Sequence, residues 1–265
     1  MAIVDILMPS YKQAHVFSQE ALNRMREYSR CKCAEERVAE AFSTGKVDIS
    51  PLHAPGECPK GKHNIYMPPT QKSCVIHYGR NACLMGRRPE AEYVLFMDDD
   101  MVPPADALDR LVAHRKDIVG GICTRRADPP VPNVHWFMDE VQNFGGIEQW
   151  DQSLGLMEVD SIGAAFVLLS RKVIEDLAAS YHRETYEAMG NGWWFEFLKN
   201  PSGHEWGEDV SLSWKAKRLG YSIWADMTLK VGHVGDYIYD LGDYLVNMER
   251  IASQTKAAGA QHVYA

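Results

Sequence analysis

The chain has 265 residues, of which 46% are hydrophobic and 10% aromatic, so it can bury a substantial core. Its formal net charge of -8 repels polyanions and excludes a protein that coats nucleic acid with its whole surface. No stretch reaches the roughly 18 apolar residues of a membrane span, and the start of the chain lacks a secretory signal pattern, so we expect a cytoplasmic protein.

The first half of the chain alternates short apolar runs with helical patterns, which is typical of βαβ units and a mainly parallel sheet. Residues 3–8 predict a first strand, and a helix capped by Ser18 is expected to run to about residue 30. A strand is expected over residues 74–78 and a helix over residues 80–87. We therefore expect one Rossmann-like α/β domain over residues 1–238, with helices flanking the sheet.

Residues 31–73 interrupt this alternation with a stretch rich in Cys, Pro, Gly and Lys, which we interpret as an irregular insertion. Its Cys31, Cys33, His53, Cys58 and His63 would suffice for one tetrahedral zinc ion. Their spacing matches no zinc pattern, so free thiols are favoured over a structural zinc. A disulfide framework is disfavoured for all six cysteines of the chain, which are Cys31, Cys33, Cys58, Cys74, Cys83 and Cys123.

A strand apolar on both faces, over residues 93–97, runs directly into Asp98, Asp99 and Asp100. Open α/β sheets bind ligands at the carboxyl ends of their strands. Clustered carboxylates repel one another, and a divalent cation offsets that repulsion, with oxygen ligands favouring Mg²⁺ or Mn²⁺. The alternative is a solvated acidic loop or a helix cap, which these three residues alone do not exclude.

The second half of the chain continues the α/β pattern around two less regular segments. Pro103 and Pro104 suit the first turn of a helix. The further elements expected, in order, are a strand over 118–122, a loop-rich segment over 128–155, a strand over 164–169, a helix over 171–179, an aromatic loop over 193–197, a helix over 208–219 ended by Gly220, and a helical extension over 239–265. The extension suits packing on the domain or a homodimer contact.

Several short segments resemble GT-A glycosyltransferases, especially those of the family 2 type. Phe96 to Met101 followed by Pro103 is similar to the strand and DXD motif of that family. Leu7-Met8-Pro9-Ser10-Tyr11 resembles its first strand and nucleotide-binding turn, and Arg80-Asn81 resembles its Arg-Asn pair on the preceding helix.

The resemblance continues towards the carboxyl end of the chain. Asp160 to Ala165 is similar to the family's small-residue turn beside the sugar, and Trp206-Gly207-Glu208-Asp209 to its Gly-Glu-Asp segment. Val231 to Gly235 resembles the region of its late metal-binding histidine. The motifs follow the order of the family, which implies a GT-A fold.

The resemblance also implies roles for individual residues. Asp100 would bind a metal directly, Asp98 would contact the ribose or a metal-bound water, and His233 would complete the metal site and favour Mn²⁺ over Mg²⁺. The metal would neutralise charge on the leaving nucleotide. The expected donor-binding residues are Pro9, Ser10, Tyr11, Arg80, Asn81, Asp98, Asp99, Gly163 and Ala164.

An enzyme that inverts the anomeric centre also needs a base for the acceptor hydroxyl. We expect Asp209 to be that base and Glu208 to position the acceptor, although acids also occur in a first helical turn simply because the helix dipole favours them. Aromatic residues near this helix are expected to line the acceptor site or to pack in the core; they are Trp193, Trp194, Phe195, Phe197 and Trp206.

The leading hypothesis is therefore transfer of a hexose from a nucleoside-diphosphate sugar, with UDP as the expected carrier, to an acceptor hydroxyl. A nucleotidyltransferase acting on a sugar phosphate is an alternative, but residues 9–13 lack the glycines of a phosphate loop. A non-catalytic nucleotide- or carbohydrate-binding module is a third reading. The acceptor stays open: a glycan, a lipid-linked sugar, a protein, a small molecule or a hydroxymethylated base in DNA.

Overall fold

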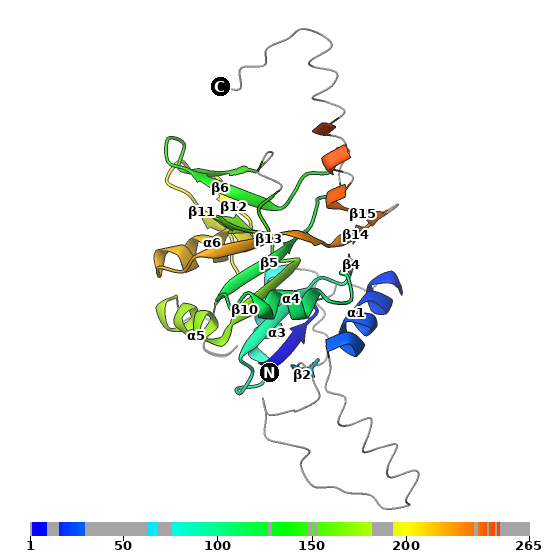
Figure 1. Cartoon of the computed structure of the whole chain (residues 1–265). Coiled ribbons are helices and arrows are strands. Elements are labelled where there is room, and N and C mark those ends of the chain that lie inside the picture. The colour runs from blue at the N-terminus through cyan, green and yellow to red at the C-terminus, as the bar shows by residue number, and fades with distance from the viewer. Residues whose placement is uncertain are drawn as a thin grey trace, which may run out of the picture.

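The chain folds as a mixed α/β protein in which helices flank a large central sheet (Figure 1). The computed structural model describes residues 2–9, 16–29, 63–67, 76–126, 129–147, 150, 153–181, 193–235, 238–242, 244–246 and 248–249. The helices are α1 (Val16–Ser29), α3 (Ile76–Met85), α4 (Ala107–Ala113), α5 (Arg171–Ser180) and α6 (Glu208–Arg218).

Seven strands form the central sheet in the order β2-β1-β3-β10-β5-β13-β8. Strands β2, β1, β3, β5 and β13 run in one direction, while β10 and β8 run antiparallel to their neighbours. The expected Rossmann-like, mainly parallel sheet is thus present. The strands are β1 (Ala2–Leu7), β2 (His63–Tyr66), β3 (Tyr93–Met97), β5 (Ile118–Ile122), β8 (Leu156–Val159), β10 (Phe166–Ser170) and β13 (Ile223–Lys230).

Both faces of the sheet are buried because helices cover each of them. Successive residues of β3 alternate between two apolar clusters, with Val94 and Phe96 on one face and Leu95 and Met97 on the other. Helices α3, α5 and α6 contribute to the first cluster, and α1 and α4 to the second. This three-layer arrangement accounts for the continuous apolar runs of the central strands.

Three small sheets surround the carboxyl ends of the parallel strands. One pairs β4 (Met101–Val102), β14 (Gly232–Val234) and β15 (Ile238–Tyr239), and another pairs β6 (Val134–Met138), β7 (Asn143–Gly146) and β9 (Ser161–Ile162). The third joins β11 (Leu198–Lys199) to β12 (Glu205–Trp206). They bring segments distant in sequence to one edge of the sheet.

Several local predictions are wrong. Residues 76–78 begin helix α3 rather than ending a strand, because a short apolar run does not distinguish a buried strand from a buried helix. Ser18 lies inside α1 with its side chain buried, so it is not the cap. Pro103 and Pro104 precede α4, which begins at Ala107 after the short strand β4.

The segments predicted to be irregular contain more structure than expected. The region 128–155 holds the β6–β7 hairpin, and residues 63–66 of the presumed insertion form β2, an edge strand parallel to β1. His63 contacts Asp109 through its Nε2 at 3.3 Å, whereas the other proposed zinc ligands Cys31, Cys33, His53 and Cys58 lie outside the described residues. The zinc hypothesis stays a prediction.

The start of the carboxyl-terminal extension packs on the domain. Leu241 and Tyr244 are buried in the cluster that includes α5 and α6, and the ring of Tyr244 stacks on Trp150 at 5.7 Å. Residues 250–265 lie outside the described part. Within that part, no helix is both long and apolar enough to cross a bilayer.

Candidate functional site

A cleft of about 280 Å³ opens at the edge of the sheet where the parallel strands end. Asp98 follows β3, Thr124 follows β5 and His233 follows β13, and all three line the cleft. Because β10 is antiparallel, the residues before it reach the same edge, where the N–H of Asp98 donates to the carbonyl of Ala165 at 2.9 Å. The topology itself therefore assembles the site, as expected for an open α/β sheet.

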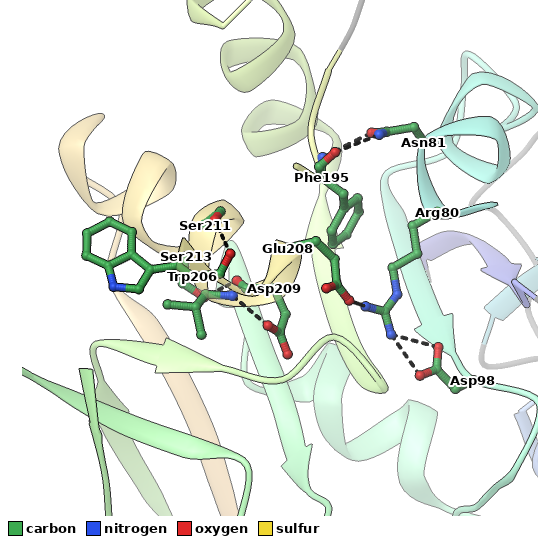
Figure 2. A network of polar contacts seen from close by, with 10 residues as sticks. Arg80, Asn81, Asp98, Phe195, Trp206, Glu208, Asp209, Ser211 and Ser213 are labelled. Carbon is green, nitrogen blue, oxygen red and sulfur yellow. Dashed lines mark hydrogen bonds and ion pairs between the residues drawn. The ribbon is translucent and has the colours of Figure 1, made fainter. Parts of the chain in front are cut away.

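Arg80 of α3 is the central cation of this cleft (Figure 2). Its Nη2 donates to Oδ2 and Oδ1 of Asp98 at 2.7 and 3.0 Å, and its Nη1 donates to Oε1 of Glu208. The guanidinium carbon lies 5.7 Å from the ring centre of Phe195. One buried arginine thus joins the end of β3 to the start of α6, a role that its fixed fork of donors suits.

Burial and charge oppose each other in this cluster. Burial raises the pKa of Asp98 and of Glu208, against the opposing effect of the Arg80 guanidinium. For Arg80, burial would lower the pKa, but the surrounding carboxylates of Asp98, Glu208 and Asp209 raise it overall. Around the whole cleft, the acids Asp98, Glu208 and Asp209 outnumber the arginines, Arg80 and Arg125, by one.

Asp100 and His233 form a second pair beside Arg80. Strand β14 pairs with β4, which places His233 opposite Met101 and its Nε2 at 3.2 Å from Oδ2 of Asp100. Arg126 Nη1 lies 3.3 Å from the same carboxylate. Burial alone would raise the pKa of Asp100, but the hydrogen bond and charge of His233, with the charge of Arg126, hold it below its usual value.

Both ring nitrogens of His233 face acceptors. Nδ1–H donates to the carbonyl of Thr124 at 2.7 Å, and Nε2–H donates to Oδ2 of Asp100 at 3.2 Å. Burial would lower the pKa of His233, but these hydrogen bonds and the charge of Asp100 raise it overall. A metal ion at this position would replace the proton on Nε2, while the Thr124 carbonyl keeps the ring oriented. Among the described residues, no three His, Cys, Asp or Glu side chains converge as a preformed metal cluster, and the carboxylate of Asp98 is held by Arg80. The donor set fits a divalent ion shared between Asp100, His233 and an incoming ligand.

The small-residue turn before β10 lines the cleft at Gly163. A neighbouring side chain explains why this position holds a glycine. A Cβ at Gly163 would lie 2.4 Å from Nδ2 of Asn133. Asn133 cannot readily move away, because its Oδ1 accepts from the N–H of Cys123 at 3.1 Å. Ala164 is buried beneath the turn, while Ala165 faces the cleft.

Helix α6 begins at the opposite wall of the cleft. Gly207 caps the helix without a side-chain hydrogen bond, and Glu208 and Asp209 occupy the first turn. Oδ1 of Asp209 accepts from the N–H of Val210 at 2.8 Å, and both residues line the cleft. The positive end of the helix dipole favours the ionised form of acids at these positions.

The cleft lining also includes Arg125, Asn133 and His135, which no sequence motif indicated. His135 is buried, and burial lowers its pKa, so its ring is neutral near pH 7. Its Nδ1, the Oγ1 of Thr124 and the Nε of Arg80 are buried without a hydrogen-bond partner. Such orphaned atoms in a native fold require an explanation, and a polar ligand supplies one. The alternating residues of β6 would have revealed His135 had that segment not been predicted as a loop.

Other predicted site residues lie away from the cleft. The Asn81 amide holds the 193–195 loop: Oδ1 accepts from the N–H groups of Trp194 and Phe195 at 3.0 Å, and Nδ2 donates to the Phe195 carbonyl at 2.8 Å. Pro9 is buried after β1, and Asp99 is half-buried; neither is among the residues that line the cleft. Ser10 and Tyr11 lie outside the described residues.

The aromatic residues expected to line an acceptor site mostly pack inside the protein. Trp193, Trp194, Phe195 and Trp206 are at most 6% exposed, and only Phe197 of this group is exposed. The ring of Phe195 packs edge-on against Phe96 of β3 at 5.1 Å. These rings support the cleft from behind and do not offer a sugar-binding face.

Comparisons with known proteins find structural similarity but no match of sequence. A scan of protein-family models finds no match to the sequence, and a search of curated proteins finds none either. Among solved structures, the protein described as A197 from STIV aligns with 89% of this chain and 86% of its own, at 12% identity and a TM-score of 0.43.

Proposed function

We propose that this protein is a metal-dependent glycosyltransferase of the GT-A type, which transfers a hexose from a nucleoside-diphosphate sugar to an acceptor hydroxyl. The observation that carries the proposal is that Asp98, His233, Arg80 and the first turn of α6 line one cleft, with Asp100 in contact with His233. These groups come from separate segments of the chain, each of which resembles the corresponding motif of that family.

Asp100 and His233 would hold the divalent metal, with Asp98 close by. The ion would act as a Lewis acid that neutralises negative charge on the diphosphate. His233 is suited to this position because the Thr124 carbonyl accepts its Nδ1–H and leaves Nε2 to act as a ligand. The imidazole favours Mn²⁺ over Mg²⁺.

The cations of the cleft would bind the donor nucleotide. Arg80 and Arg125 line the cleft, and Arg126 contacts Asp100, so positive charge lies on either side of the acids. Arg80 also keeps Asp98 and Glu208 in fixed orientations, which lowers the cost of organising the site when the donor arrives. The absence of a Cβ at Gly163 lets Asn133 pack against the turn, and both residues line the cleft.

Asp209 is the candidate base for an inverting transfer. It lies in the first turn of α6 and lines the cleft, whereas Glu208 is already engaged by Arg80. The acceptor hydroxyl would bind between Asp209 and the sugar, lose its proton to the carboxylate and attack the anomeric carbon as the nucleotide leaves. Neutral His135, beside Asp209, offers the acceptor a hydrogen-bond partner.

The proposal is tested by measuring melting temperatures with UDP, GDP, CDP, TDP and their hexose derivatives, each with and without Mn²⁺. A ligand at 100 times its Kd stabilises the native state by about 2.7 kcal/mol. We expect one nucleotide to raise the melting temperature in a Mn²⁺-dependent manner and Asp100→Ala to abolish that rise. Asp106→Ala is the matched control. Asp106 precedes α4, its side chain makes no cap hydrogen bond, and it does not line the cleft.

Two results would contradict the proposal. One is a Mn²⁺-dependent shift of equal size in Asp100→Ala and in the wild type. The other is release of pyrophosphate from a nucleoside triphosphate mixed with a sugar phosphate, which would indicate a nucleotidyltransferase instead. Hydrolysis of the stabilising nucleotide sugar to the free sugar and nucleoside diphosphate is the expected activity.

A further inference from the structure

A second pocket, of about 330 Å³, lies between helix α6 and the β6–β7 hairpin. Its residues are distinct from those that line the cleft. Three aromatic rings form much of its wall, and they belong to Phe137, Phe144 and Trp214. Its volume is at the lower end of the range of about 300–1,000 Å³ found for small-molecule sites.

The aromatic wall is held in place from behind. The rings of Phe137 and Phe144 meet edge-on at 5.1 Å, and the buried Trp206 packs against Phe144 at 5.3 Å and against Trp214 at 5.8 Å. Trp206 is itself fixed, because its Nε1 donates to Oδ1 of Asn143 at 2.9 Å. The three rings of the wall are only half-buried, so they keep apolar surface available to a ligand.

Charged groups of both signs complete the pocket. Lys217 pairs with Asp160, and the second carboxylate oxygen of Asp160 accepts from the N–H of Phe137 at 2.8 Å. Arg218 lies over the ring of Trp214 at 5.0 Å, and Asp139 adds a second acid. Two acids and two bases leave no net charge, which disfavours polyanions and strong cations but offers donors and acceptors to hydroxyl groups.

We propose that this pocket binds a neutral sugar residue of an oligosaccharide. Aromatic faces pack against the apolar C–H face of a sugar ring, and the charged side chains around them can hydrogen-bond the hydroxyls at its rim. A nucleic acid would need an excess of positive charge that the balanced pocket does not present.

The position of the pocket connects it with the cleft. Val210 of α6 lines the cleft and Trp214 lines the pocket, four residues further, or about 6 Å along the helix. On β6, His135 lines the cleft and Phe137 the pocket, about 7 Å apart. A glycan chain bound in the pocket would therefore extend towards Asp209. Its role as the acceptor rests on the function proposed above, whereas the binding itself does not.

The test uses the full-length protein without nucleotide or metal. A glycan array identifies neutral oligosaccharides that bind, and isothermal titration with the best of them measures Kd for the wild type and the variants. We expect Phe144→Ala to weaken binding at least about fivefold, since an aromatic contact contributes about 0.5–1.5 kcal/mol beyond its buried area. The matched control is Trp136→Ala, which removes a 42% exposed ring of the same hairpin that does not line the pocket.

A second variant distinguishes loss of the binding site from loss of folding, in case Phe144→Ala is unstable. Asp139→Asn changes an exposed side chain, keeps its size and should weaken binding while the melting temperature stays unchanged. Failure of every neutral glycan on the array to bind at millimolar concentration would overturn the inference. So would equal loss of binding in Trp136→Ala, or selective capture of anionic glycans.

The two proposals fail separately. Glycan binding without any Mn²⁺-dependent nucleotide shift would leave the pocket intact as a sugar site and remove the glycosyltransferase. A nucleotide shift without glycan binding would retain the enzyme and remove the sugar site.

Discussion

Helix α6 carries two ion-pair clusters that differ in their surroundings. At its start, Glu208 and the neighbouring Asp98 share Arg80 at the wall of the cleft. About two helical turns further along, fully buried Lys215 donates to Oε1 of Glu196 and to the carbonyl of Trp193, at 3.1 and 3.0 Å. The Lys215–Glu196 pair is buried and contains one base and one acid, so we describe it as an internal brace. The cleft is open to solvent and is lined by three acids and two arginines.

The comparison predicts that cleft residues govern turnover and not stability. Asp209→Asn keeps the shape of the side chain but removes the proposed base, so the proposed hydrolysis of the nucleotide sugar should fall by about 10²–10⁴-fold. The Mn²⁺-dependent rise in melting temperature with the nucleotide should persist. Steady-state kinetics and thermal shift together check this, and an unchanged turnover number would remove Asp209 as the base.

The buried brace should show the opposite behaviour. Lys215→Ala leaves Glu196 buried without its cation and is expected to cost about 3–5 kcal/mol of unfolding free energy, measured by urea denaturation. Lys172→Ala, which breaks the exposed pair with Asp176, serves as the control and should change stability far less. Similar losses in the two variants would contradict the assignment of Lys215 as a brace.

A third cluster, on the opposite face of the sheet from α6, should add a pH dependence. Burial alone would raise the pKa of Asp226, but hydrogen bonds from His114 and Thr228 and the charge of Arg110 hold it below its ordinary value. The ionised carboxylate therefore stabilises the fold above about pH 4, and this contribution is lost as the pH falls through the lowered pKa.

Asp226→Asn should accordingly cost about 1.5–3 kcal/mol near pH 7, because hydrogen bonds to a charged group are removed. The difference from the wild type should shrink as the pH falls below about 4. Urea denaturation across pH 3–7 measures it, and a difference that grows in acid would show that the pKa of Asp226 is not lowered.

The smallest expected effect concerns Gly163, which lines the cleft. Gly163→Ala forces Asn133 to shift and is expected to cost about 1–2 kcal/mol and to weaken nucleotide-sugar binding. Gly146→Ala is a suitable control, because a Cβ at Gly146 meets nothing within 4 Å. Equal melting temperatures for the two variants would indicate that Asn133 moves freely.

The central layer of the fold is predictable because its signals are local. Strands over 93–97 and 118–122 follow from apolar runs buried on both faces, and both are confirmed. The end of α6 is equally local, since Gly220 adopts a φ of +87° that other residues rarely adopt. The position of Asp98 and Asp100 at the carboxyl-end edge of the sheet is predictable too, because they directly follow the apolar strand over 93–97.

The walls of the candidate site are less predictable because they depend on long-range pairing. The strand character of 134–138 emerges only when β6 meets β9, so His135 and Asn133 were missed. Asn81 belongs to the Arg-Asn pair that resembles the family motif. Only the fold shows that its amide hydrogen-bonds to the 193–195 loop. Exposure of individual aromatic rings likewise depends on the elements that cover them.

The pairing of β14 with β4 has a consequence for biosynthesis. Asp100 and His233 are separated by 133 positions, and Arg80 and Glu208 by 128, so the acids emerge from the ribosome long before their partners. Contacts between such distant residues slow folding. A chain interrupted before β14 would carry the aspartates without the histidine, so the proposed metal site could form only after His233 has been synthesised.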